Sequence, residues 1–106
     1  MGQGRTEVMK RLREFKEIAK KYKVERIILF GSQATGKTKG SSDVDLIIVS
    51  RDKRKLELLQ SLYHEWHINQ RINLPVDFIC YTPEEFEKKE GEISIVSLAL
   101  KEGIEI

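Results

Sequence analysis

The feature that most constrains this chain is an eight-residue run, Asp43-Val44-Asp45-Leu46-Ile47-Ile48-Val49-Ser50, in which acids open an otherwise apolar segment. Side chains alternate between the two faces of a β-strand, so positions 43, 45, 47 and 49 share one face and 44, 46 and 48 share the other. Beyond the acids both faces are apolar. Such a strand has to be covered on both sides, as in the centre of a sheet between helices.

Three stretches have the patterning of helices. Apolar residues recur with helical spacing over 6–22 and again over 53–69, which predicts an amphipathic helix in each. A third helix is predicted to start at Thr82-Pro83-Glu84-Glu85, where a threonine cap, a proline in the first turn and acids beside the helix dipole occur together. The apolar segment 93–100 has two interpretations, a helix packed on the sheet or a surface for a partner.

Strand patterning separates these helices. Branched and aromatic residues predict strands over 24–30 and 75–81 beside the strand at 43–50, and residues 104–106 are a candidate edge strand. The fold class that follows is α/β (α+β), a small mixed β-sheet of three to four strands with helices packed on it. A length of 106 residues suits a single domain, 1–106, with one modest core.

Composition narrows the class of protein. The chain has 19 Lys and Arg and 17 Asp and Glu, which gives a formal net charge of +2. So small a charge neither indicates nor excludes binding to nucleic acid or membranes, and the nature of the partner stays open. No stretch approaches the ~18 consecutive apolar residues of a membrane span. The lone cysteine, Cys80, cannot form an internal disulfide, which favours the cytoplasm. A core this small is also readily extended by a homo-oligomer.

Asp43 and Asp45 are the first candidates for chemistry, because both point the same way from the opening end of their strand. Two carboxylates held this close repel one another unless a cation neutralises them, and Mg²⁺ prefers oxygen ligands of this kind. The structural alternative is a solvated junction between a loop and a strand, where aspartate commonly forms an Asx turn.

Asp77 is the third candidate, since it interrupts an apolar strand near its start. The long helix predicted over 53–69 connects this strand to the one at 43–50, and a crossover of that length usually makes two strands parallel. Parallel neighbours begin at the same edge of a sheet, so Asp77 is predicted to lie beside Asp43 and Asp45 and to complete a metal site. A partly exposed edge position or a backbone hydrogen bond would explain Asp77 without a metal.

A glycine-serine pair directly follows the first predicted strand. Gly31 permits close approach of the backbone to a ligand, the amides after it can open onto a phosphate, and Ser32 adds a hydroxyl donor. The linker that follows most simply turns the chain back, which brings this pair to the same corner as the acids. Without the acids, an ordinary turn would be the better interpretation.

The same segment also matches a second phosphate-binding pattern. Residues 31–38, Gly-Ser-Gln-Ala-Thr-Gly-Lys-Thr, satisfy the eight-residue Walker A motif after a strand. A P-loop, however, continues from its Lys-Thr pair into a long helix, whereas here another strand is predicted within a few residues. Lys37 and Lys39 are therefore predicted as auxiliary phosphate ligands, and a P-loop NTPase is kept as an alternative.

Together these residues resemble a known family. Gly31-Ser32, ten intervening residues and then Asp43-Val44-Asp45 are similar to the signature of the minimal nucleotidyltransferases, in the DNA polymerase beta-like superfamily. The resemblance implies the nucleotidyltransferase fold and a metal-dependent enzyme that binds ATP or another NTP and transfers a nucleoside monophosphate to a hydroxyl acceptor. It also implies that Gly31 and Ser32 bind the triphosphate, that Asp43 and Asp45 ligate two Mg²⁺ ions, with Mn²⁺ as a substitute, and that Asp77 activates the acceptor.

Two further points of the resemblance concern substrate and partner. Many relatives carry arginines where Gln33 and Thr35 stand here, which leaves Lys37 and Lys39 as the nearby cations. Many are also encoded beside a helical protein of the HEPN type, act as the antitoxin of a toxin-antitoxin pair and transfer AMP onto that partner. The resemblance thus implies a HEPN-type partner. A non-catalytic nucleotide- or partner-binding module with the same fold is the alternative.

Other reactive side chains fit structural roles better. His64 and His67 lie three positions apart on a predicted helix without a zinc-type motif around them, so a hydrated or half-buried helix face is expected. Cys80 alternates with Phe78 along a strand and is predicted to be a buried thiol rather than a nucleophile.

Overall fold

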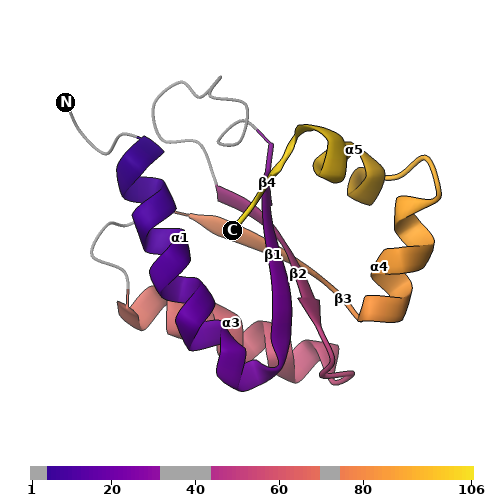
Figure 1. Cartoon of the computed structure of the whole chain (residues 1–106). Coiled ribbons are helices and arrows are strands. Elements are labelled where there is room, and N and C mark those ends of the chain that lie inside the picture. Colours follow the sequence, from indigo (N-terminus) through magenta and orange to yellow (C-terminus); the bar gives the residue numbers. More distant parts are fainter. Residues whose placement is uncertain (1–4, 32–43, 70–74) are drawn as a thin grey trace.

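Helices lie on both faces of a small β-sheet in the computed structural model of this chain (Figure 1). The structure describes residues 5–31, 44–69 and 75–106. None of the helices in these residues is long and apolar enough to cross a membrane. The elements are α1 (Arg5–Ala19), a 3₁₀ turn (Lys20–Tyr22), β1 (Val24–Phe30), β2 (Val44–Ser50), α3 (Lys55–Asn69), β3 (Val76–Tyr81), α4 (Pro83–Glu90), α5 (Ile95–Glu102) and β4 (Ile104–Glu105).

The sheet has the strand order β3-β2-β1-β4. β1 runs antiparallel to both β2 and β4, whereas β2 and β3 run parallel. α3 provides the crossover between the parallel strands, as its length predicts, and β4 is the edge strand expected after residue 103. The predicted fold class, a small mixed sheet with helices packed on it, is confirmed.

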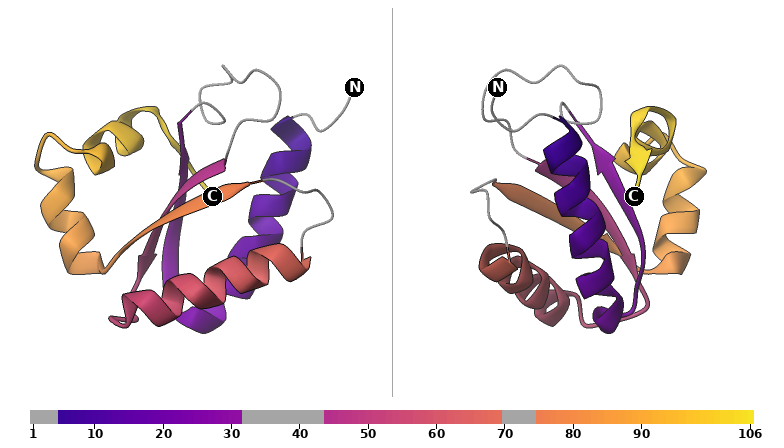
Figure 2. Two further views of the ribbon diagram at one scale, coloured as in Figure 1. Left: turned by 180° about the vertical axis from the view of Figure 1, so that it is seen from behind. Right: turned by 60° about the vertical axis from the view of Figure 1, so that its left-hand side comes forward.

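β2 is the central strand that its sequence requires. Every side chain from Val44 to Ser50 is buried except that of Asp45, which is partly exposed. The even-numbered apolar residues of β2 pack in one core with α1 and α3, and Ile47 and Val49 pack in another with α4 and α5. Figure 2, in its right-hand view, shows these helix pairs on opposite sides of the sheet. The acid at the start of β2 is thus the exception in an otherwise buried strand.

The larger core lies under α1 and α3 and is closed by aromatic rings. The ring centroid of Phe15 lies 5.2 Å from that of Trp66 and 5.5 Å from that of Phe78, and Tyr63 lies 4.7 Å from Phe78. These separations suit edge-to-face and stacked ring contacts. Trp66 is only 1% exposed. This face of the sheet is therefore covered by closely packed side chains.

The smaller core lies under α4 and α5. It contains Phe86 from α4 and two residues of α5, Val96 and Ala99, packed against the sheet. α4 begins as predicted, because the Thr82 hydroxyl accepts from the amide of Glu85 at 3.2 Å while the Glu85 carboxylate accepts from the amide of Thr82 at 2.9 Å. This capping box fixes where the chain leaves β3 and starts to cover the second face.

Two predicted helices are longer than the observed ones. The helix predicted over 6–22 ends at Ala19, because the chain tightens into a 3₁₀ turn that Lys23 closes in a left-handed conformation, with φ of 62°. The helix predicted over 53–69 begins instead at Lys55. There the Asp52 carboxylate accepts from the amide of Arg54 at 3.0 Å, and this local turn precedes the helix.

The apolar segment 93–100 is helical from Ile95 onward, in agreement with the helical one of its two interpretations, and α5 continues to Glu102. Ser94 caps the helix, since its hydroxyl accepts from the amide of Ser97. Val96 and Ala99 face the sheet and are buried, whereas Leu98 remains 54% exposed. α5 therefore covers the sheet with one side and presents apolar side chains to solvent with another.

Candidate active site

Three of the predicted site residues meet at one edge of the sheet. Gly31 follows the last residue of β1, Asp45 is the second residue of β2, and Asp77 is the second residue of β3. The register pairs Phe30 with Asp45 and Asp45 with Asp77. Figure 1 shows the end of β1 and the starts of β2 and β3 at the same end of the sheet. Gly31, Asp45 and Asp77 come together because β2 runs antiparallel to β1 and parallel to β3.

Asp45 and Asp77 project from the same face of the sheet. Directly paired residues of neighbouring strands point to one side, with the strands ~4.8 Å apart. Two positions further along, Ile47 and Ile79 belong to the core under α4 and α5. The two acids therefore continue that face beyond the end of the small core. Asp77 is exposed and Asp45 is partly exposed.

Gly31 lies directly against Asp45. Its φ of 76° lies in the left-handed region, and a Cβ built on it would lie 2.6 Å from Oδ2 of Asp45. Residues other than glycine rarely adopt this backbone conformation, and the Asp45 carboxylate fills the space that a side chain at position 31 would need. Gly31 thus allows a close approach of the Asp45 carboxylate, whereas the prediction concerned the approach of a ligand. Phosphate binding by Gly31 stays a prediction.

The remaining predicted ligands, Ser32, Lys37, Lys39 and Asp43, lie outside the described residues. Among residues 5–31, 44–69 and 75–106, no group of three His, Cys, Asp or Glu side chains is placed to hold a metal ion. Asp45 and Asp77 supply two neighbouring carboxylates, and Asp43 precedes Asp45 by two positions in the sequence. A three-carboxylate metal site at this edge remains a prediction that depends on Asp43.

The histidines and the cysteine lie away from this edge. His64 and His67 are exposed on α3, which covers the opposite face of the sheet from the acids, so the expected hydrated helix face is confirmed. Cys80 is partly buried near the other end of β3, where burial raises the pKa of its thiol from 9.0 to about 11. The thiol is therefore protonated at neutral pH, as expected of a packing residue rather than a nucleophile.

A hollow beside Gly31 was not predicted from the sequence. It measures about 230 Å³ and lies between the end of β1 and α5, lined by Phe30, Gly31, Ile95, Leu98, Ala99 and Glu102. The available signal was the composition of α5, which is apolar on more than the one side that a sheet can cover. How α5 packs beside β1 depends on contacts between distant parts of the chain, and no local pattern reports it.

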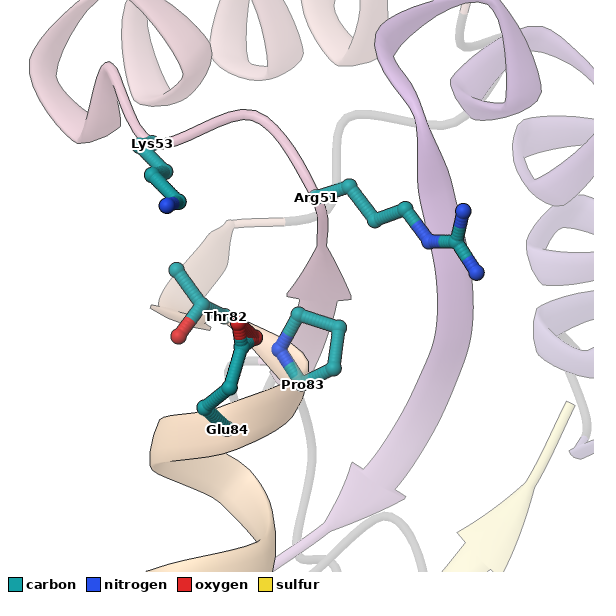
Figure 3. A pocket seen from close by; sticks show the side chains of 5 residues that line it. All are labelled: Arg51, Lys53, Thr82, Pro83 and Glu84. Carbon is teal, nitrogen blue, oxygen red and sulfur yellow. The ribbon is translucent and has the colours of Figure 1, made fainter.

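A second hollow lies at the opposite end of the sheet (Figure 3). It measures about 370 Å³ and is lined by Arg51, Lys53, Thr82, Pro83 and Glu84. Arg51 is turned toward β1, where its guanidinium pairs with Glu25, and the first turn of α4 is capped by its own residues. The length of β2 and β3 separates this hollow from the acids, so it belongs to no common site with them.

The strand arrangement also bears on the P-loop alternative. Residues 32–38 of the Walker A pattern lie outside the described residues. In the described part of the chain, however, β2 pairs antiparallel with β1 and begins opposite its end, with Phe30 beside Asp45. A P-loop strand leads instead through a helix to a parallel neighbour. The antiparallel pairing of β1 and β2 therefore agrees with a glycine-serine turn followed by an acid-bearing strand and not with a P-loop.

Comparison with known proteins gives the same assignment. The family model described as a nucleotidyltransferase domain matches residues 12–103. Two proteins of Methanocaldococcus jannaschii are provisionally named protein adenylyltransferases. The first is 35% identical, over 70% of this chain and 74% of its own length. The second is 34% identical, over 67% of this chain and 90% of its own length. A crystal structure of a provisionally named nucleotidyltransferase from Sulfolobus solfataricus, 19% identical, shares the fold with a TM-score of 0.61 over 99% of this chain and 89% of that one. The chain therefore belongs to the nucleotidyltransferase family and is an enzyme of that class.

Proposed function

We propose that this protein transfers AMP from ATP to a hydroxyl group of a partner protein, with divalent metal ions bound at the acid edge of the sheet. The observation that carries the proposal is the pairing of Asp45 with Asp77 directly beside Gly31. A phosphate-binding turn next to neighbouring carboxylates is what phosphoryl chemistry at a metal site requires. Cys80, a reduced and partly buried thiol, is compatible with the cytoplasm as the place of action.

The donor set fits a hard cation. Asp45 and Asp77 place two carboxylates side by side on one face, and carboxylate oxygens are the ligands that Mg²⁺ prefers. We propose Asp43, Asp45 and Asp77 as the residues that hold two Mg²⁺ ions, which Mn²⁺ could replace. Bound there, the ions would polarise the phosphate and stabilise negative charge on the attacking and leaving oxygens.

The residues of the chain then have distinct tasks. Gly31 and Ser32 hold the triphosphate tail, with Lys37 and Lys39 as auxiliary cations. Asp77 receives the proton of the acceptor hydroxyl, whose oxygen forms a bond to the α-phosphorus. The bond from that phosphorus to the β-phosphate bridge breaks, and pyrophosphate leaves. The products are an acceptor that carries AMP and free pyrophosphate, so no covalent intermediate on the enzyme is needed.

The acceptor we propose is a protein. The names of the two Methanocaldococcus jannaschii relatives describe adenylyl transfer to protein, which supports both AMP as the transferred group and a protein as its target. The family resemblance adds a HEPN-type helical protein as that target, in a toxin-antitoxin pair in which this chain is the antitoxin. This pairing rests on the resemblance alone.

Labelled ATP tests the proposal. With Mg²⁺ and a co-purified partner, ATP labelled at the α-phosphate should mark the partner, ATP labelled at the γ-phosphate should mark nothing, and pyrophosphate should appear in step with the label. Mass spectrometry of the partner would identify an added AMP. Transfer of γ-label, or release of ADP and phosphate, would contradict attack at the α-phosphorus. Stable partner and ATP binding without any transfer would favour the non-catalytic module.

A further inference from the structure

We infer that the hollow between the end of β1 and α5 receives the base of the nucleotide substrate and favours bases that carry an exocyclic amino group. The inference rests on the proposed function, because it locates the nucleoside part of a molecule whose phosphates lie at the acid edge. It goes further by assigning residues of α5, which the predicted site did not include, to substrate choice.

The position of the hollow follows from Gly31. This residue lines the hollow and also lies against the carboxylate of Asp45. A ligand at the acids is therefore next to a residue that lines the hollow. Figure 1 shows α5 beside the end of β1, on the side of the sheet that carries the small core. A nucleotide with phosphates at Gly31 has its other end within reach of α5.

The size of the hollow suits one ring system. Its volume is about 230 Å³. Pockets that enclose a whole drug-sized molecule measure roughly 300–1,000 Å³. The hollow therefore matches a base and leaves the sugar and phosphates outside it, toward the acids.

The lining argues against phosphate as the occupant. Glu102 is the only charged residue that lines the hollow in the described part of the chain, and its carboxylate would repel a phosphate. The other lining residues that the structure describes are apolar side chains and Gly31. Ile95 and Leu98 are 42% and 54% exposed, so a flat ring laid on them would bury apolar surface that is now in water. Phe30 adds an aromatic side chain, on which bases commonly stack.

Glu102 provides the basis for selection among bases. A carboxylate accepts hydrogen bonds and donates none when it is ionised. Adenine and cytosine present an amino group as a donor where uracil presents a carbonyl oxygen, and guanine carries a different amino group. ATP is therefore expected to bind more tightly than UTP by about tenfold, the lower end for a hydrogen bond to a charged group, because Glu102 is exposed to water.

Binding measurements on the full chain test the inference. ATP, UTP and inorganic tripolyphosphate are titrated by calorimetry in the presence of Mg²⁺. Leu98→Asn should weaken ATP binding by about tenfold through lost apolar contact and leave tripolyphosphate binding unchanged. Leu100→Asn is the matched control, because Leu100 lies on the same helix, is 36% exposed and does not line the hollow. Glu102→Gln should reduce the preference for ATP over UTP toward unity.

The outcomes separate this inference from the proposed function. If ATP and tripolyphosphate both fail to bind the wild-type chain, the proposed function fails. If ATP binds and is transferred, but the Leu98 and Glu102 variants keep wild-type affinity and preference, the base lies elsewhere and only this inference fails. If Leu98→Asn instead blocks transfer to a protein while ATP affinity stays unchanged, the hollow belongs to the acceptor and the inference is overturned.

Discussion

The two faces of the sheet differ in how completely helices cover them. On the face under α1 and α3, the rings of Phe15, Trp66 and Phe78 close a core that reaches the whole length of β2. On the other face, α4 and α5 cover a smaller core, and the strands continue beyond it to Asp45 and Asp77. One face thus holds the fold together, and the other leaves room for a ligand.

This difference assigns separate tasks to alternate residues of one strand. In β2, Leu46 and Ile48 belong to the large core, whereas Asp45 and Ile47 belong to the face that carries the acids. Substitutions on the first face should change the free energy of unfolding, and substitutions at the acid edge should change the chemistry. Four experiments can break or sharpen this division.

The largest effect is expected at the acids. Asp45→Asn or Asp77→Asn should lower the rate of AMP transfer by about a thousandfold or more, because each removes a charge worth several kcal/mol in the reaction. The free energy of unfolding should change little, since both side chains are at least partly exposed. Transfer of α-label and thermal melts measure the two effects. Glu57→Gln, at an exposed acid on α3, is the control, and near-normal transfer by either Asn variant would refute the assignment.

The next largest effect belongs to the sealed face. Trp66→Ala should reduce the free energy of unfolding by roughly 3–5 kcal/mol, because it empties a buried site that contacts Phe15 and Phe78. Urea unfolding followed by circular dichroism measures this loss. Leu56→Ala, on the same helix and 67% exposed, should cost far less. Transfer per folded molecule should be preserved, and a fall in transfer with unchanged stability would contradict the division between faces.

A smaller effect on both properties is expected at Gly31. Gly31→Ala should cost about 1–2 kcal/mol for its left-handed backbone, and the new Cβ must displace the carboxylate of Asp45. We expect transfer to fall about tenfold or more, because a shift of about 1 Å in a reacting group has effects of that order. Gly91→Ala is the matched control, since the nearest described atom to a Cβ there would be Lys88 O at 3.7 Å and φ is −85°. Equal activity of the two variants would show that Asp45 needs no such space.

The last experiment concerns Cys80, which takes part in no proposed step of the transfer. Because burial raises the pKa of its thiol from 9.0 to about 11, the thiolate fraction at pH 8 should be about a hundredfold lower than in the unfolded chain. Alkylation by iodoacetamide should therefore be slow and should accelerate as the pH rises toward 11. The folded state holds this proton more tightly, so the stabilisation is complete below pH 9 and is lost as the pH rises through about 11. Rapid alkylation at pH 8 in the folded protein would contradict the burial.

Much of the fold could be predicted because the strongest patterns in the sequence are long. The two apolar faces of β2 require cover on both sides, and the helix of residues 55–69 is long enough to impose a parallel crossover. These two constraints place Asp45 and Asp77 at the same end of the sheet, and the register of β2 and β3 then pairs them directly. The antiparallel pairing of β1 with β2 agrees with the predicted linker that turns the chain back.

The remainder could not be predicted because it depends on local competition or on distant contacts. The Asp52 turn and the left-handed Lys23 decide where helices begin and end. The turn is held by three hydrogen bonds from Arg54 to the Asp52 carboxylate, and Lys23 by one hydrogen bond from its amide to the carbonyl of Lys20. The contact between Gly31 and the Asp45 carboxylate depends on the register of β1 and β2. A hydrophobic pattern determines which face of a strand is buried, but registers that differ by two residues bury the same face. The hollow beside α5 depends on how a short helix packs against a strand more than sixty positions earlier in the sequence.

The place of each acid in the strand order has a consequence for how an acceptor arrives. Asp45 is in a strand with neighbours on both sides, whereas Asp77 is in β3, the outermost strand of the described sheet on that side. A bulky molecule that approaches Asp77 along the plane of the sheet therefore meets no further strand of the described chain. If Asp77 receives the proton of the acceptor hydroxyl, as proposed, the direction of approach is from the outer side of β3. A folded protein could then present one hydroxyl to this enzyme without entering a deep cleft, while the nucleotide occupies the inner side between Asp45 and α5.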